Sequence, residues 1–110
     1  MSVADGRIVV FVTAPGAEDA ARIGRALVEE GLCACANVVG PIRSIYRWQG
    51  EVKDEPEVLL MLKTRGALFE RLETRVRELH TYEVPEIVAL PIAAGSDPYL
   101  RWIDDATAGG

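Results

Sequence analysis

Apolar residues are arranged along this chain in two ways, as short unbroken runs and as stripes with helical spacing. Residues 7–13, RIVVFVT, form a β-branched and aromatic run with almost no polar interruption, which predicts a central strand buried on both faces. Residues 17–30 carry apolar side chains at the spacing of an amphipathic helix, and Gly31 is typical of a left-handed cap after a helix. The inner stripe of this helix is expected to consist of Ala20, Ile23, Leu27 and Val28.

The next stretch predicts a long hairpin. Residues 32–39, LCACANVV, indicate a strand of small residues, which Gly40-Pro41 interrupts and residues 42–49 resume. Gln49-Gly50 is typical of a hairpin turn. The return limb, residues 51–62, is polar at first and then becomes the dense apolar run VLLML. The two limbs are too long to pair wholly within a four-stranded sheet.

A second helix and another buried strand follow the hairpin. Residues 67–80 have a helical stripe, and residues 82–91, with IVAL between two prolines, predict the fourth core strand. Asp97 and Pro98 predict a short last helix, with the aspartate as its N-cap and the proline at its first position. The expected inner residues are Leu68, Leu72, Val76 and Leu79 in the second helix, and Tyr99, Trp102, Ile103 and Ala106 in the last one.

The order strand, helix, strand, strand, helix, strand, with a small terminal helix, predicts an α+β fold. It is the ferredoxin-like βαββαβ sandwich, with helices on one face of an antiparallel sheet. We expect one domain over residues 1–110, with its core at about residues 7–106. The long hairpin creates an exposed edge, which self-association by strand addition would cover. A monomer with a loose hairpin tip is the alternative, but Tyr46 and Trp48 are poor residues to leave in water, so assembly is favoured.

Composition narrows the choice of partners. Lys and Arg number 12 against 17 Asp and Glu, and the net charge of −5 argues against nucleic acid and against anionic membrane surfaces. We expect no membrane span, because there is no long apolar run, and no secretory signal. Cys33 and Cys35 lie two residues apart, where a disulfide within a strand is geometrically poor. We interpret them as reduced thiols on one face of a strand in a cytoplasmic protein.

The stretch HTYEVPEIVALP, residues 80–91, holds the only histidine together with a tyrosine, two prolines and two carboxylates. His80 is a candidate metal ligand, but zinc and copper sites want three or four N or S ligands and no HxH or HxxxH pair exists. A helix-end histidine that hydrogen-bonds to nearby groups is the alternative. The spacing of Cys33 and Cys35 suits a soft metal, although small buried thiols are the favoured interpretation.

Acidic residues gather in two segments of the sequence, the hairpin and the surroundings of Pro85. They are Glu51, Asp54, Glu55 and Glu57 in the first segment, and Glu83 and Glu86 in the second. In an assembled protein they would form an acidic, oxygen-rich surface, and ordinary solvated charge is the alternative. The sequence has no GxxxxGK[ST] phosphate-binding motif, and its strands offer too few exposed aromatic residues for RNA binding.

Six sequence blocks carry a resemblance to a known family. They are FVTAP, CACANVV, SIYRWQGEV, LMLKT, HTYEVPEIVALPI and YLRW, in this order between Ile8 and Trp102. With these blocks the chain resembles the CutA family, the divalent-cation tolerance proteins. The resemblance implies a ferredoxin-like subunit in a compact homotrimer, in which the long hairpins join neighbouring sheets edge to edge.

The resemblance also implies a role in tolerance of copper and other divalent cations. In some members the implied metal contacts are a cysteine at the end of the first strand and a histidine pair before the tyrosine. The corresponding residues here are Val12, Leu79 and His80, and Thr81 follows where proline is common. Only His80 remains as a ligand, so weak binding of Cu(II) or another divalent cation is expected.

Two functional hypotheses result. The first is a non-enzymatic, cytoplasmic homotrimer of divalent-ion (copper) tolerance, whose partner is itself and which binds a divalent cation weakly at His80. The second, by fold-level likeness to the PII signalling proteins, is an effector-binding trimer. The residues expected to line its intersubunit cleft, or to take part in assembly, are Tyr46, Trp48, Tyr82 and Glu83. An enzyme ranks last, because no nucleophile elbow or nucleophile–base pair accompanies His80.

Overall fold

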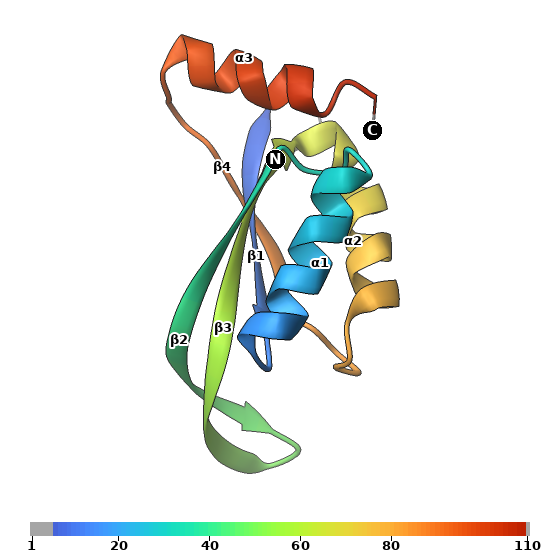
Figure 1. The fold of residues 1–110 in the computed structure, drawn as a ribbon. Coiled ribbons are helices and arrows are strands. Elements are labelled where there is room, and N and C mark those ends of the chain that lie inside the picture. Colours follow the sequence, from blue (N-terminus) through green and yellow to red (C-terminus); the bar gives the residue numbers. More distant parts are fainter. Residues whose placement is uncertain (1–5, 110) are drawn as a thin grey trace.

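The computed structural model describes residues 6–109 as one antiparallel sheet with two helices packed on the same face (Figure 1). The strand order is β2-β3-β1-β4. The strands are β1 (Arg7–Ala14), β2 (Cys35–Trp48), β3 (Glu51–Arg65) and β4 (Ile87–Pro91). The helices are α1 (Ala17–Glu29), α2 (Phe69–Leu79), which continues the 3₁₀ turn η1 (Gly66–Leu68), and α3 (Asp97–Ala106). This arrangement is the ferredoxin-like α+β sandwich, so the predicted subunit fold is confirmed.

The core lies between the sheet and the helices α1 and α2. Successive side chains of a strand point to opposite faces, and the alternate residues Ile8, Val10 and Val12 of β1 are buried almost completely. Helix α1 comes close to β2 at Gly24, where an added Cβ atom would lie 2.9 Å from the Cβ of Ala36. The remaining core side chains with no exposed surface include Ile23, Leu27, Leu60, Leu62, Leu72 and Val76.

The opposite face of the sheet carries no layer of α1 or α2 (Figure 1). The register places Phe11 beside Met61 of β3 and Val88 of β4 on this face. We call the apolar side chains that share it the open face: Val9, Phe11, Val39, Leu59, Met61, Val88 and Leu90. Val88 and Leu90 keep 49% and 50% of their surface exposed. The prediction that residues 7–13 are buried on both faces is therefore correct in the single chain only for the face that the helices cover.

The β2–β3 hairpin pairs on both sides of one register shift, from Cys35 beside Lys63 out to Trp48 beside Glu51. Gln49 and Gly50 both have positive φ, 49° and 82°, which is the backbone of a tight hairpin turn and confirms that prediction. The predicted interruption at Gly40-Pro41 is wrong. A register shift between Val39 and Ile42 accommodates these two residues, so β2 continues through them.

Two strands begin later than the sequence predicts. β4 begins at Ile87, opposite Val12, rather than at residue 82, because residues 82–86 have no partner on β1. β2 begins at Cys35, since the N–H groups of residues 32 and 33 donate to the carbonyl of Leu27 at the end of α1. Cys33 therefore lies outside the strand and is buried, whereas Cys35 is half-buried. The two thiols are free, as predicted, but they do not share one face of a strand.

Helix α3 lies across one end of the sheet (Figure 1). Its N-cap is Ser96, not Asp97 as predicted, because Asp97 already belongs to the first turn. Arg7 ties the helix to β1 with two hydrogen bonds to the Asp104 carboxylate, of 3.0 and 2.6 Å. Of the predicted inner residues only Ile103 is buried, and Tyr99, Trp102 and Ala106 are exposed in the single chain. Among residues 6–109, no helix has the length and apolar character needed to cross a membrane.

Candidate functional site

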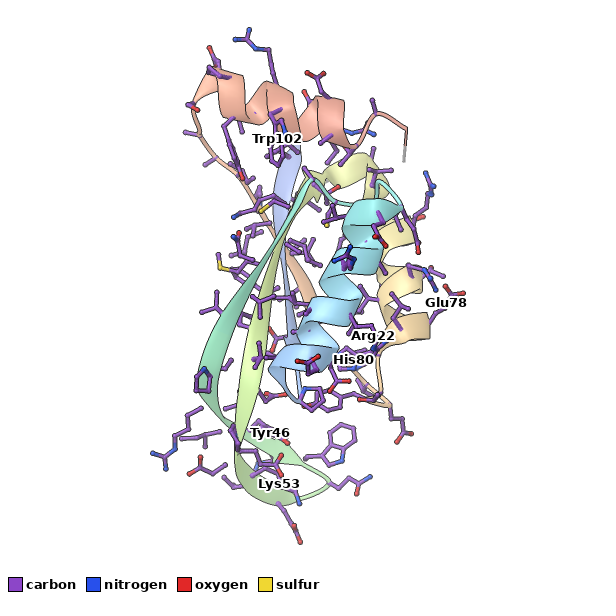
Figure 2. All side chains as sticks on the ribbon, viewed as in Figure 1. Arg22, Tyr46, Lys53, Glu78, His80 and Trp102 are labelled. Carbon is purple, nitrogen blue, oxygen red and sulfur yellow. The ribbon has the colours of Figure 1, made fainter. Side chains whose placement is uncertain are left out.

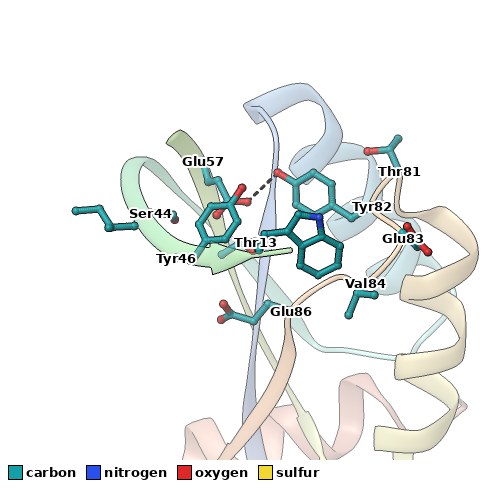
Figure 3. A pocket seen from close by; sticks show the side chains of 11 residues that line it. Thr13, Ser44, Tyr46, Glu57, Thr81, Tyr82, Glu83, Val84 and Glu86 are labelled. Carbon is teal, nitrogen blue, oxygen red and sulfur yellow. Dashed lines mark hydrogen bonds between the residues drawn. The ribbon is translucent and has the colours of Figure 1, made fainter. Parts of the chain in front are cut away.

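A pocket of about 640 Å³ lies where three separate segments meet: the far half of the hairpin (residues 42–57), the end of β1, and the loop after α2 (Figure 3). We call it the hairpin pocket. Its lining residues are Thr13 of β1, Ser44, Ile45, Tyr46, Trp48 and Glu57 of the hairpin, and Thr81, Tyr82, Glu83, Val84 and Glu86 of the loop. It therefore contains all four of the predicted cleft residues, which lie on two segments far apart in the sequence.

Local sequence explains how each segment reaches the pocket. The alternation of strand side chains puts Ser44, Tyr46 and Trp48 on one side of β2. Pro85 pushes Val84 towards extended backbone, so the loop after α2 cannot continue as a helix. The loop instead runs past the end of β1 before it enters β4 at Ile87.

Tyr82 and Glu57 form the best defined polar contact of the pocket. The Tyr82 hydroxyl donates to Oε2 of Glu57 at 2.7 Å (Figure 3). Burial, and then this hydrogen bond to a carboxylate, raise the pKa of Tyr82 well above its ordinary value, because both disfavour the phenolate. Glu57 itself keeps only 9% of its surface exposed. The pocket thus holds a nearly buried carboxylate whose partner is a neutral phenol.

Tyr46 repeats this arrangement on the neighbouring part of the hairpin. Its hydroxyl donates to the carboxylate of Glu55. The hydrogen bond to Glu55 is the main cause that raises the pKa of Tyr46 to about 12, with burial as a second cause. Both tyrosines of the pocket therefore stay protonated at neutral pH, and their rings are held in place by carboxylates.

His80 lies next to the pocket, at the C-terminal end of α2, and is nearly buried with 9% of its surface exposed. Its Nε2 lies 2.7 Å from the carbonyl oxygen of Thr13, and its Nδ1 accepts the N–H of Tyr82 at 3.0 Å. This pattern requires the neutral tautomer with the proton on Nε2. Both ring nitrogens are therefore engaged with backbone, which is the arrangement of the helix-end histidine considered above.

Neighbouring groups hold the imidazole in this position. The rings of His80 and Tyr82 lie with their centroids 4.6 Å apart. Arg22 of α1 donates to the carbonyl of Leu79 at 3.0 Å, close to His80 at the end of α2 (Figure 2). Among residues 6–109, no group of three or more His, Cys, Asp or Glu side chains is close enough together to hold a metal ion. A metal at His80 would have to displace one of its hydrogen bonds.

The two cysteines lie away from the pocket. Cys33 is in the core, and burial raises the pKa of its thiol to about 12. Cys35 shares the face of the sheet that α1 and α2 leave uncovered, and its Sγ lies 3.6 Å from Oδ1 of Asn37. The arrangement is that of a buried, unreactive thiol and a separate half-buried one.

The structure brings together only part of the predicted acidic surface. Glu57, Glu83 and Glu86 line the hairpin pocket. Asp54 pairs with Arg43 instead, at 2.7 Å, and Glu51 pairs with Lys53 at 3.3 Å. Thr13, Ser44 and Val84 also line the pocket and are not among the predicted cleft residues. Strand alternation puts Ser44 on the same side of β2 as Tyr46, but Thr13 reaches the pocket only through the pairing of β1 in the sheet.

Comparison with known proteins gives one consistent result. A family model described as CutA1 divalent ion tolerance protein matches residues 8–106. A divalent-cation tolerance protein CutA of Thermus thermophilus is 54% identical over 99 residues, which cover 90% of this chain and 96% of that protein. A solved Cut A1 structure from the same organism has a TM-score of 0.90 at 52% identity, and the match covers 92% of this chain and 98% of that one.

Two more distant relatives have names that give their cellular compartment. A chloroplastic CutA protein of Arabidopsis thaliana is 46% identical over 91% of this chain, which spans only 55% of that relative. The solved periplasmic divalent cation tolerance protein CutA of Archaeoglobus fulgidus has a TM-score of 0.89 at 36% identity, over 92% of this chain and 98% of that one.

Proposed function

The chain belongs to the CutA1 divalent ion tolerance family, and on that premise we propose that it acts in tolerance of copper and other divalent cations as a non-enzymatic homotrimer. The observation that carries this proposal is the extent of the family match, which runs from the first residues of β1 to the end of α3. Relatives that match over this length are named for divalent-cation tolerance.

The open face supports the homotrimer. Its seven apolar side chains are spread over all four strands, and further burial of a half-exposed Val or Leu stabilises a complex by roughly 1 kcal/mol each. A second and a third copy of the chain would cover this face and the edges of β2 and β4. Light scattering is expected to give three times the chain mass of 12.0 kDa. A monomer at micromolar concentration would contradict the proposal.

We propose that the divalent cation, with Cu(II) as the first candidate, binds weakly at His80. Binding is weak because the metal needs a ring lone pair, and Nδ1 already accepts the Tyr82 amide while Nε2 carries the proton that faces Thr13. A hydrogen bond must therefore break before the ion binds. The mixed nitrogen and oxygen surroundings of this region suit copper better than calcium or magnesium.

The metal proposal is tested by calorimetric titration of Cu(II) and Zn(II) into the wild-type trimer and into His80→Gln. Glutamine keeps a side-chain donor for the Thr13 carbonyl but removes the imidazole. We expect about one ion per chain in the wild type, no binding in His80→Gln, and unchanged binding in the control Thr81→Ala. Binding that survives His80→Gln, or no heat in the wild type, would refute the role of His80.

The proposal also includes the absence of enzymatic activity and a location in the cytoplasm. The protein is non-enzymatic, in agreement with an imidazole whose two nitrogens face backbone groups and not a nucleophile. It acts in the cytoplasm, where the free thiols Cys33 and Cys35 would stay reduced. Fractionation of cells that express the full chain tests the location, and recovery in the periplasm would overturn it.

A second candidate function is effector binding in a cleft of the trimer, and the hairpin pocket favours it. Its volume of about 640 Å³ falls within the range of small-molecule sites, and it is lined by all four of the predicted cleft residues. A thermal-shift screen of metabolites separates the two candidates. A specific organic ligand that raises the melting temperature, while divalent metals leave it unchanged, would favour the second.

A further inference from the structure

The walls of the hairpin pocket suit one class of ligand. They combine aromatic rings with carboxylates, and no Lys, Arg or His side chain is among the described residues that line the pocket. The rings are those of Tyr46, Trp48 and Tyr82, and the carboxylates are those of Glu57, Glu83 and Glu86. Figure 3 shows Tyr46 and Tyr82 gathered around the Glu57 carboxylate, with Glu86 on another side of the pocket. The charged side chains among the described lining residues are all negative, so their field repels an anion.

The carboxylates of the pocket also lack counter-charges within residues 6–109. Eight carboxylates of the described chain form ion pairs with Arg or Lys, and Glu57, Glu83 and Glu86 are among the eight that form none. Glu57 is the extreme case, because it is nearly buried and its side-chain hydrogen-bond partner among residues 6–109 is the neutral Tyr82 hydroxyl. A carboxylate buried without a cation costs free energy, which a bound positive charge would offset.

The size and the walls of the pocket favour an organic cation over a bare metal ion. Calcium takes six to eight oxygen ligands at close range, and the described residues contain no group of three His, Cys, Asp or Glu side chains placed to hold an ion. Ammonium and guanidinium groups, in contrast, bind both to carboxylates and to the faces of aromatic rings. The hydrogen bonds of Tyr46 to Glu55 and of Tyr82 to Glu57 hold two of these rings in place before any ligand arrives.

We propose that the hairpin pocket binds a small organic cation, a primary ammonium or guanidinium group on an apolar or aromatic body. The charged group lies at Glu57, and the body packs against Trp48 and the two tyrosines. This inference rests on the second function proposed above, effector binding in the cleft, and names the chemical class of the effector.

The test uses four probes with the assembled full chain at neutral pH. They are 2-phenylethylammonium, agmatine, the neutral 2-phenylethanol and the anionic 3-phenylpropionate. Calorimetry is expected to show binding of the two cations, with 2-phenylethylammonium about tenfold or more tighter than 2-phenylethanol. The anion is expected not to bind.

Matched variants locate the binding charge. Glu57→Gln removes the negative charge but keeps an acceptor for the Tyr82 hydroxyl, so it is expected to weaken 2-phenylethylammonium binding about tenfold and to leave 2-phenylethanol unchanged. Glu18→Gln makes the same change of net charge at an exposed position of α1 outside the pocket, and is expected to change neither. An equal loss of cation binding in both variants would show a general field effect and overturn the proposal.

The other outcomes distinguish this inference from the functions it builds on. Equal affinity for 2-phenylethylammonium and 2-phenylethanol, or binding of 3-phenylpropionate, would overturn the cation class and leave effector binding in place. No binding of any probe by a protein that light scattering shows to be a trimer would overturn the organic cation, and the thermal-shift screen then decides separately whether the pocket binds another effector. Binding of Mg²⁺ or Ca²⁺ that disappears in Glu57→Gln would overturn the organic cation and support the divalent-cation role instead.

Discussion

The two halves of the β2–β3 hairpin have the same backbone pairing but opposite surroundings. In the half next to the helices, Leu60 and Leu62 have no exposed surface. In the far half, residues 42–57, Ile45 and Val52 keep 65% and 64% of their surface exposed. The register shift between Val39 and Ile42 lies between the two halves. Strand pairing alone therefore does not bury side chains, since burial depends on what packs against the strands.

The far half also supplies five of the residues that line the hairpin pocket. Tyr46 and Trp48, each 39% exposed, face the hairpin pocket together with Glu57, while the near half contributes no residue to it. A surface of this kind gains free energy only when a neighbouring copy or a ligand covers it. The near half thus stabilises the subunit, and the far half is where we propose that a ligand or a neighbouring copy makes contact.

The largest expected effect comes from the near half. Leu60→Ala deletes a fully buried side chain and is expected to lower the free energy of unfolding by about 3 kcal/mol, whereas Ile45→Ala in the far half should lower it by less than about 1 kcal/mol. Urea denaturation at one fixed protein concentration measures both, since association contributes to the result. Equal losses would mean that the far half is as much a part of the core as the near half.

In the far half, the larger effect is expected on assembly. Trp48→Lys puts a charge where we propose that copies of the chain meet, and is expected to weaken association by about 2 kcal/mol per chain while far-ultraviolet circular dichroism stays unchanged. Light scattering at decreasing concentration measures the association. The control Thr74→Lys adds the same charge to the exposed side of α2. A trimer that tolerates both changes would show that the hairpin is not at the interface.

The next effect concerns the close packing of α1 against the near half of the hairpin. Gly24→Leu places side-chain atoms against Ala36, where even a Cβ would lie only 2.9 Å away, and is expected to destabilise the subunit by about 1.5 kcal/mol. Ala21→Leu, at an exposed position of the same helix, is the control and should be nearly neutral. Thermal unfolding of the two variants compares them directly. A neutral Gly24→Leu would mean that α1 can shift away from β2.

The smallest effect concerns the tyrosines of the far half at high pH. The pKa values of Tyr46 and Tyr82 are raised in the folded protein, so between about pH 10 and the folded value the unfolded chain loses the phenolic protons first. The stabilisation is complete below about pH 10 and decreases as the pH rises above it. Tyr82→Phe should reduce this slope, and should cost about 1 kcal/mol at neutral pH because Glu57 loses its donor.

Two measurements check this expectation. Urea unfolding from about pH 8 to about pH 11 gives the slope, and the ultraviolet absorbance of tyrosinate gives the titration of the native protein and of the chain in urea. Native tyrosines that ionise together with those of the unfolded chain would contradict the proposed role of the carboxylates.

Local patterns in the sequence were sufficient for the elements and their order. The run of β-branched residues in β1, the helical stripe of α1, the left-handed Gly31 with φ of 72° and the Gln49-Gly50 turn are all decided by short-range backbone chemistry. The same patterns failed at element ends. The cap at Ser96, the late start of β4 and the continuity of β2 through Gly40-Pro41 depend on which partner strand or helix is present.

The sequence indicated which residues a site could use, but not their arrangement. Tyr46, Trp48, Tyr82 and Glu83 were predicted for a cleft between subunits or for assembly, and in the single chain all four line one pocket. Their meeting could not be read from spacing, because Tyr82 reaches Glu57 across 25 residues and His80 reaches the carbonyl of Thr13 across 67.

The sequence by itself thus determined the helices, the strands and the chemical types available to the protein. The tertiary structure alone decided that both ring nitrogens of His80 face backbone groups, that Glu57 is nearly buried with no ion pair among residues 6–109, and that one sheet face is open in the single chain. Helical stripes and strand alternation depend on residues only a few positions apart, so they can be read directly from the sequence. The partners of buried polar groups are decided by how the strands pair in the sheet. β1 lies between β3 and β4 there, next to residues that are far from it in the sequence.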